Sequence, residues 1–240
     1  MAAIRDNMQA VSQRIERAAA AAGRNRDSVR LLAVSKTHPV ALIEEALRAG
    51  QGAFGENYVQ EALEKMDALA RLVGEARAGD VEWHLIGPLQ SNKTRLVAER
   101  FDWVHTISSV KVARRLSEQR APDRKPLSVL IQVNSSAEAT KSGVALEDAS
   151  TLARAVAQMA RLKLRGLMAI PEPAPEASVQ RARFRPLREL FERLRADGLD
   201  LDTLSLGMSD DLEAAIAEGS TMVRVGTAIF GARRRERDAA

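Results

Sequence analysis

Residues 29–49 read VRLLAVSKTHPVALIEEALRA, and this stretch shows the unit from which the chain is built. Its first seven residues, VRLLAVS, are a short apolar run that predicts a buried strand. After Pro39, a residue that suits the start of a helix, apolar residues recur at helical spacing. The stretch therefore predicts a strand followed by a helix that packs on it.

The same alternation recurs until the chain holds eight such units. The predicted strands are 29–35, 52–55, 81–86, 103–107, 127–133, 164–170, 203–206 and 222–225. The predicted helices are 41–49, 59–73, 91–100, 110–120, 146–159, 186–196 and 210–217. Eight βα units in 240 residues match a single (β/α)8 barrel of the TIM type, an α/β fold.

One domain is predicted over 1–240, with an extra N-terminal helix within 1–25 and a polar basic tail at 232–240. The helix follows from apolar residues at helical spacing, which are Ile4, Met8, Val11, Ile15 and Ala18. A doubly wound open sheet is the alternative fold. Its usual G-x-G-x-x-G turn is absent after the first strand, which ends in Ser35-Lys36-Thr37.

The composition excludes several classes of protein. Without cysteine, the chain can form no disulfide, thiol nucleophile or cysteine zinc site. Its five Phe, two Trp and one Tyr do not alternate with basic residues as a nucleic-acid platform requires. No apolar run approaches the roughly 18 residues of a membrane span. We therefore expect a cytoplasmic protein that binds neither nucleic acid nor membranes.

Lys36 is the most informative single residue, because it stands at the end of an apolar strand. In a barrel the active site is built at that end of the strands. A lysine that loses hydration there has a lowered pKa and can form a Schiff base with a carbonyl. The alternative is an ordinary lysine whose amine reaches solvent, and position alone does not separate the two.

The last two units offer groups for an anion. Barrels often bind phosphate at the loops after strands seven and eight, where Gly207, Ser209 and Gly226-Thr227 lie. Backbone N–H groups and hydroxyls there suit phosphate, although the glycines could also serve tight turns alone. Arg224 shares a strand face with Gly226. If that face is the interior, the buried cation needs an acceptor, such as a pyridine nitrogen.

An inward lysine, a phosphate cradle and an inward arginine together describe a pyridoxal 5′-phosphate site. The chain resembles the pyridoxal phosphate homeostasis protein family, whose fold is similar to the N-terminal barrel of alanine racemase. The resemblance rests on AVSKT (33–37), FGENYVQE (54–61), HLIGPLQSNK (84–93), KSG (141–143), GLMAI (166–170), LSLGMSDD (204–211) and STMVRVGTAIFG (220–231). It spans nearly all of 29–231. One departure is Ser108, where the family often has an acid.

The resemblance implies a role for six residues. Lys36 would be the Schiff-base lysine, Arg224 would face the ring nitrogen, and Asn57 would lie near the cofactor. The phosphate would be bound by Ser209, Gly226 and Thr227. A secondary role of Lys93 or Lys141 is left open. The resemblance also suggests a monomer, with transient contacts to apoenzymes that depend on pyridoxal phosphate.

Two functions remain compatible with these residues. One is a non-enzymatic protein that holds the cofactor and buffers or delivers it; the other is a racemase-like or decarboxylating enzyme that acts on amino acids. Racemisation by two bases needs a second acid or base opposite Lys36, and Tyr58 is the only tyrosine. We expect Glu56, Asp210 and Asp211 to be helix caps or loop acids. His38, His84 and His105 form no metal-binding motif, so we expect structural histidines and no metal site.

Overall fold

The apolar runs of the sequence form a parallel sheet. The structure is a computed structural model that describes residues 2–135 and 142–232. Its strands are β1 (Arg30–Val34), β2 (Ala53–Glu56), β3 (Glu82–Leu85), β4 (Trp103–Ile107), β5 (Leu127–Asn134), β6 (Val144–Ala145), β7 (Leu162–Met168), β8 (Thr203–Ser205) and β9 (Met222–Val225). All eight predicted strands are present, with ends that differ from the prediction by at most two residues.

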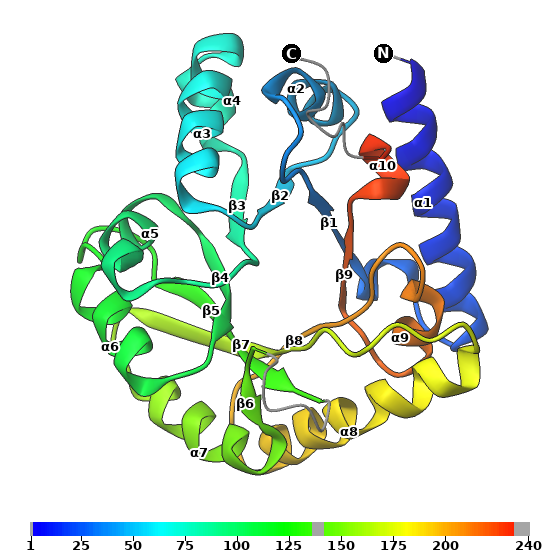
Figure 1. Ribbon diagram of the computed structural model, residues 1–240, viewed down its shortest axis with the longest axis vertical. Coiled ribbons are helices and arrows are strands. Elements are labelled where there is room, and N and C mark those ends of the chain that lie inside the picture. The colour runs from blue at the N-terminus through cyan, green and yellow to red at the C-terminus, as the bar shows by residue number, and fades with distance from the viewer. Residues whose placement is uncertain (1, 136–141, 233–240) are drawn as a thin grey trace, which may run out of the picture.

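Helices follow the strands and surround the sheet (Figure 1). They are α1 (Ala2–Ala21), α2 (Val40–Arg48), α3 (Val59–Val73), α4 (Glu75–Gly79), α5 (Thr94–Arg100), α6 (Val110–Gln119), α7 (Leu146–Ala157), α8 (Ala177–Ala196), α9 (Leu212–Ala217) and α10 (Thr227–Phe230). Two 3-10 turns, Arg26–Ser28 and Ser91–Lys93, precede β1 and α5.

The sheet closes into a barrel. Its order is β4-β3-β2-β1-β9-β8-β7-β5, and β4 also pairs with β5, so these strands form a complete ring. The described pairings are parallel, and the short β6 adds to β5 outside the ring. Closure confirms the predicted (β/α)8 barrel and excludes the open sheet. It also brings the carboxyl ends of all eight barrel strands to one mouth.

Two kinds of core hold the barrel together. The main apolar core lies between the strands and the helices and includes Phe54, Leu116 and Phe184. Inside the ring are two smaller apolar clusters, one around Leu32 and Met222 and the other formed by Trp103, Leu130 and Met168. The interior also holds His84, His105 and Arg224, all at most 4% exposed. Polar side chains therefore occupy part of the barrel's centre.

The predicted N-terminal helix is confirmed as α1. Ile4, Val11, Ile15 and Ala18 are buried, and the helix contacts α2, α9 and α10. Figure 1 shows α1 running beside α10 and the orange α9. The helix thus covers the outside of the ring where the last two units meet the first.

Several helix starts differ from the prediction, and the start of α8 differs most. α8 begins at Ala177, and Pro186 lies inside it. Proline removes one intrahelical hydrogen bond, but Phe184, Leu187 and Leu190 remain buried on one face and stabilise the helix across it. Asp210, with Glu213 three residues later, has the spacing of a capping box, but the structure forms none. Asp211 is the N-cap residue of α9, and Glu213 pairs with Arg14 of α1 instead.

Candidate functional site

One cavity of about 210 Å³ lies at the mouth of the barrel. All six residues that the sequence predicts for the cofactor line it, which are Lys36, Asn57, Ser209, Arg224, Gly226 and Thr227. They come from the ends of β1, β2, β8 and β9. Residues up to 191 positions apart in sequence, from 36 to 227, therefore meet in one place.

Lys36 stands in a turn that is clamped by a buried ion cluster. Lys65, on α3, donates to the Ser35 carbonyl oxygen at 2.7 Å and pairs with Glu56 at 2.8 Å and Glu61 at 2.6 Å. Glu61 Oε1 accepts from the Thr37 N–H at 2.5 Å. Thr37 has a φ of 63°, an uncommon value for a residue with a branched Cβ. The cluster therefore fixes the backbone on both sides of Lys36.

Glu56 belongs to this Lys65 cluster (Ser35, Glu56, Glu61 and Lys65), so its expected role as a cap or loop acid is wrong. Its side chain is fully buried and accepts from the Ser35 hydroxyl at 2.6 Å. Burial raises the pKa of Glu56, and Lys65 opposes that shift. Sequence reasoning missed Lys65 and Glu61, whose spacing on α3 looks like that of any solvated helical ion pair.

Arg224 is held inside the barrel by neighbouring strands. Its Nη1 donates to the Ser205 carbonyl oxygen at 2.6 Å and to Ser205 Oγ at 2.8 Å, and its Nη2 donates to the Ala169 carbonyl oxygen at 2.9 Å. Burial lowers the pKa of Arg224 to about 10, so it remains a cation at neutral pH. These bonds use three of the five guanidinium N–H groups, and the residue lines the cavity. A cation with donors to spare therefore faces the cavity.

The expected phosphate end of the cavity is supported from behind by α1. Arg14 donates to the Ser209 carbonyl oxygen at 2.9 Å, and Asn7 donates to the Ile229 carbonyl oxygen at 2.8 Å. At Gly226, a Cβ atom would lie 3.1 Å from the Val34 carbonyl oxygen, so a side chain would crowd β1. Helix α1 thus holds the turns that carry Ser209 and Thr227.

A second cavity of about 380 Å³ adjoins the first and shares Asn57, Ile86 and Ile170 with it. Thr106, Gln132 and Glu172 supply polar groups there. The side-chain oxygen of Asn57 is buried and has no hydrogen-bond partner among the described residues. An acceptor without a partner beside a cavity is typical of a position that contacts a ligand.

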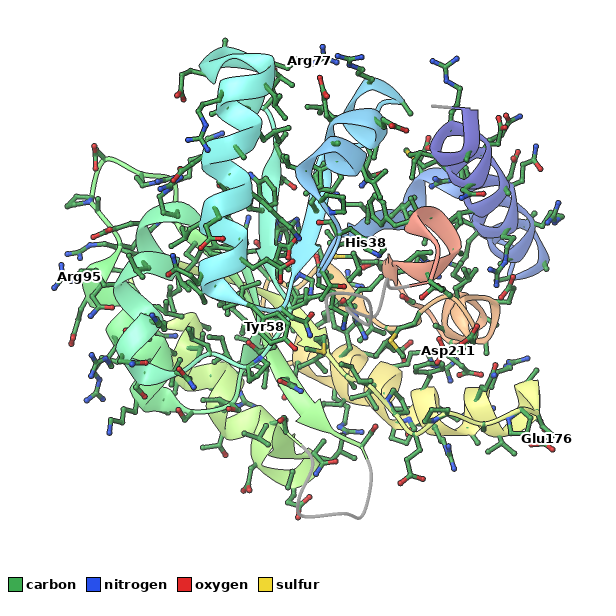
Figure 2. All side chains as sticks on the ribbon, turned by 45° about the horizontal axis from the view of Figure 1, so that its top comes forward. His38, Tyr58, Arg77, Arg95, Glu176 and Asp211 are labelled. Carbon is green, nitrogen blue, oxygen red and sulfur yellow. The ribbon has the colours of Figure 1, made fainter. Side chains whose placement is uncertain are left out.

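Other residues singled out in the sequence lie elsewhere. Tyr58, at the start of α3, is 58% exposed and does not line the cavity (Figure 2). Lys93 is half-buried in the 3-10 turn before α5 and does not line it either. Asp210 does line the cavity, whereas Asp211 accepts from the Met208 N–H. Lys141 and the tail arginines Arg233, Arg234, Arg235 and Arg237 lie outside the described residues.

The histidines divide into two groups. His84 and His105 meet inside the barrel with their ring nitrogens 3.0 Å apart, whereas His38 packs on Phe230. Burial lowers the pKa of His84 to about 4 and that of His105 well below its usual value, so both are neutral at pH 7.

Residues 2–135 and 142–232 contain no group of three potential metal ligands and no helix suited to crossing a membrane.

Comparisons with known proteins agree with this geometry. Residues 2–234 match the family model for the N-terminal domain of alanine racemase. The pyridoxal phosphate homeostasis protein of Pseudomonas aeruginosa is 57% identical over 233 residues, 97% of each chain. PipY of Synechococcus elongatus, solved with PLP bound, is 39% identical, with 85% of this chain and 93% of PipY covered and a TM-score of 0.75.

Alanine racemase of Clostridium difficile shares the fold alone. It has a TM-score of 0.72 at 14% identity, and the match covers 98% of this chain but 58% of the racemase. High identity over full length is found instead with the homeostasis proteins. The chain therefore belongs to the pyridoxal phosphate homeostasis protein family, within the proteins that contain the N-terminal domain of alanine racemase.

Proposed function

We propose that this protein binds pyridoxal 5′-phosphate in the cavity at the barrel mouth and serves vitamin B6 homeostasis. It holds the cofactor on Lys36 and buffers it or delivers it to enzymes that need it, without turnover of its own. The observation that carries the proposal is that all six predicted residues line one cavity. The names of its relatives and the PLP-bound PipY support it.

The residues of the cavity fit the chemical groups of the cofactor. When bound, pyridoxal phosphate supplies an aldehyde for a lysine amine and an electron-withdrawing ring. Lys36 offers the amine, and Arg224 offers N–H donors and a positive charge to the ring nitrogen. Ser209 and Thr227 offer hydroxyls beside Gly226 for the phosphate. The unpartnered oxygen of Asn57 adds an acceptor at the same mouth.

A carrier is favoured over a racemase by the surroundings of Lys36. Racemisation by two bases needs a second proton-transfer group on the far side of the substrate. Tyr58 is exposed and outside the cavity lining. Arg224 would keep the ring nitrogen unprotonated, because a pyridinium beside a guanidinium is repelled, and an unprotonated ring withdraws electrons less strongly. This makes carbanion chemistry harder without excluding it, since racemases with such an arginine exist, so the missing second base is the stronger argument.

The first test is Lys36→Ala, with Lys93→Ala as the matched control. We expect Lys36→Ala to keep its fold but to lose the visible absorption of bound cofactor and its attachment after borohydride reduction. Lys93→Ala retains both, because Lys93 does not line the cavity. Peptide mapping of the reduced wild type locates the label. Label retained in Lys36→Ala contradicts the proposal, and turnover of an amino acid by the wild type supports the racemase-like alternative.

Four further features belong to the proposal. We infer a cytoplasmic monomer that meets acceptor apoenzymes only transiently, and a single domain over 1–240. The cysteine-free composition suits a reducing compartment. The full-length match to the Pseudomonas protein supports the single domain. Sedimentation of the purified protein with and without pyridoxal phosphate tests the monomer.

A further inference from the structure

A line of polar side chains runs through the barrel interior from Arg224 toward the opposite end of the barrel. Ser205 Oγ lies 2.8 Å from Arg224 Nη1 and 3.3 Å from His105 Nδ1. His105 Nε2 lies 3.0 Å from His84 Nδ1, and His84 Nε2 lies 3.5 Å from Glu82 Oε2. Ser205, His105 and His84 are fully buried. Glu82 is partly exposed, starts β3 and also pairs with Arg30.

The two ends of this line determine where its hydrogens lie. Arginine has donors only, so Ser205 Oγ accepts from Arg224. The Ser205 hydroxyl hydrogen then points to His105 Nδ1, since the described residues offer it no other acceptor at hydrogen-bond distance. His105 therefore carries its hydrogen on Nε2 and donates it to His84 Nδ1. His84 in turn carries its hydrogen on Nε2.

The carboxylate end requires the same direction. The contact with His84 lowers the pKa of Glu82 to about 2, so Glu82 is an anion at neutral pH. An N–H of His84 is attracted to that anion across 3.5 Å, whereas a bare ring nitrogen would be repelled. The reverse order would also leave the buried Ser205 hydroxyl hydrogen without an acceptor, which is costly. A donor cation at one end and an anion at the other thus favour one arrangement.

We propose that Glu82, His84, His105 and Ser205 form a directed relay that positions Arg224 for the ring nitrogen of pyridoxal phosphate. The relay orients the Ser205 oxygen to accept from Arg224 and leaves the other guanidinium donors for the cavity. His84 Nε2 makes no hydrogen bond among the described residues, so Glu82 acts on the chain through its charge, while the hydrogen-bonded links from His84 to Arg224 reinforce one another in a low-dielectric interior. The inference rests on the proposed function and assigns positioning roles to residues outside the cavity lining.

The affinity test uses two probes on cofactor-free protein. One is pyridoxal phosphate, and the other is its analogue with a C–H group in place of the ring nitrogen, which cannot accept from Arg224. We expect His105→Leu to weaken the binding of pyridoxal phosphate by roughly three- to tenfold, which corresponds to the loss of about one hydrogen bond. The affinity of the same variant for the analogue stays within about twofold of the wild-type affinity. Arg224→Gln removes the preference for pyridoxal phosphate over the analogue and serves as the positive reference.

Glu82→Gln keeps an oxygen near His84 but removes the charge that acts on it across 3.5 Å, at a partly exposed position that tolerates substitution. We expect this variant to lose roughly threefold in affinity for pyridoxal phosphate and to keep its affinity for the analogue. Asp67→Asn is the matched control, because Asp67 pairs with Arg100 in an ion pair of similar exposure and does not contact the relay. An equal loss for both probes, or no loss for either, in His105→Leu and Glu82→Gln overturns the relay.

A second measurement needs no cofactor. Imidazole ¹⁵N shifts of the three histidines report which nitrogen carries hydrogen. We expect Nε2–H and bare Nδ1 at both His84 and His105, with neither titrating between about pH 5 and 8. Nδ1–H at either residue overturns the proposed direction. If the wild type binds no pyridoxal phosphate, the proposed function fails, while these shifts still decide the direction of the relay.

Discussion

The turn that presents Lys36 depends on a buried lysine that is matched to several partners. Lys65 is buried and contacts the Ser35 carbonyl oxygen, Glu56 and Glu61 at once. Removing one partner of such a pair leaves an uncompensated charge, which costs more than the intact pair contributes. The Lys65 cluster therefore ties the stability of the barrel to the turn that presents Lys36.

At the residue scale we expect Lys65→Met to lower the free energy of unfolding by about 3–5 kcal/mol, because Glu56 is then buried without a cation. The double variant Glu56→Gln with Lys65→Met recovers part of that loss, since the buried charge is gone. Urea unfolding followed by circular dichroism measures both. A double variant no more stable than the single one would show that packing, and not charge, makes Lys65 important.

At the scale of elements, α1 acts as a brace for the last two βα units. It is the first element of the chain, yet it contacts α9 and α10, which follow the turns that carry Ser209 and Gly226. Arg14 pairs with Glu213 on α9 and also bonds the Ser209 carbonyl oxygen. Because the contact reaches the backbone, α1 fixes the turn itself.

We therefore expect Arg14→Ala to weaken the binding of pyridoxal phosphate by roughly three- to tenfold, because the variant loses a charged hydrogen-bond donor. Binding of pyridoxal, which lacks the phosphate, changes much less. Arg17→Ala, an exposed position on the same helix, is the control. Titration followed by absorbance compares the two ligands. Equal weakening of both would place the effect of Arg14 outside the phosphate end.

At the scale of the whole molecule, barrel closure places neutral histidines in its centre. Burial disfavours the protonated forms of His84 and His105, so their pKa values in the folded state lie below the ordinary value of about 6.5. The unfolded chain binds protons at these residues below about pH 6.5, while the folded chain does not. Stability contributed by the histidines is thus present above about pH 6.5 and is lost as the pH falls.

Below about pH 6.5 we expect the free energy of unfolding to fall by up to roughly 1.4 kcal/mol for each histidine and each pH unit. For His84 this fall ends near the folded-state pKa of about 4. Urea unfolding at about pH 7, 6 and 5 measures the slope, and His105→Leu reduces it by one histidine's share. A slope that is the same in the wild type and in His105→Leu would mean that His105 has an ordinary pKa in the folded barrel.

Local patterns were sufficient for the architecture, whereas the choice of the six site residues also used the family resemblance. Apolar runs and helical spacing are local properties, and parallel strands in a closed barrel bring their carboxyl ends together whatever their distance in sequence. Lys36, Asn57 and Arg224 could therefore be predicted to share a mouth, as could the turns at Ser209 and Gly226-Thr227. Their roles toward the cofactor remain predictions.

Only the tertiary structure decided which buried polar groups meet. Lys65 has the helical spacing of a surface ion pair, and His84, His105 and Ser205 lie on three strands with no motif to link them. Their pairing depends on strand register and on which face of each strand points inward, and a shift of one residue would separate them. The sequence by itself determined the barrel and its mouth; tertiary packing decided how the buried charges are matched, because that match depends on distances between strands.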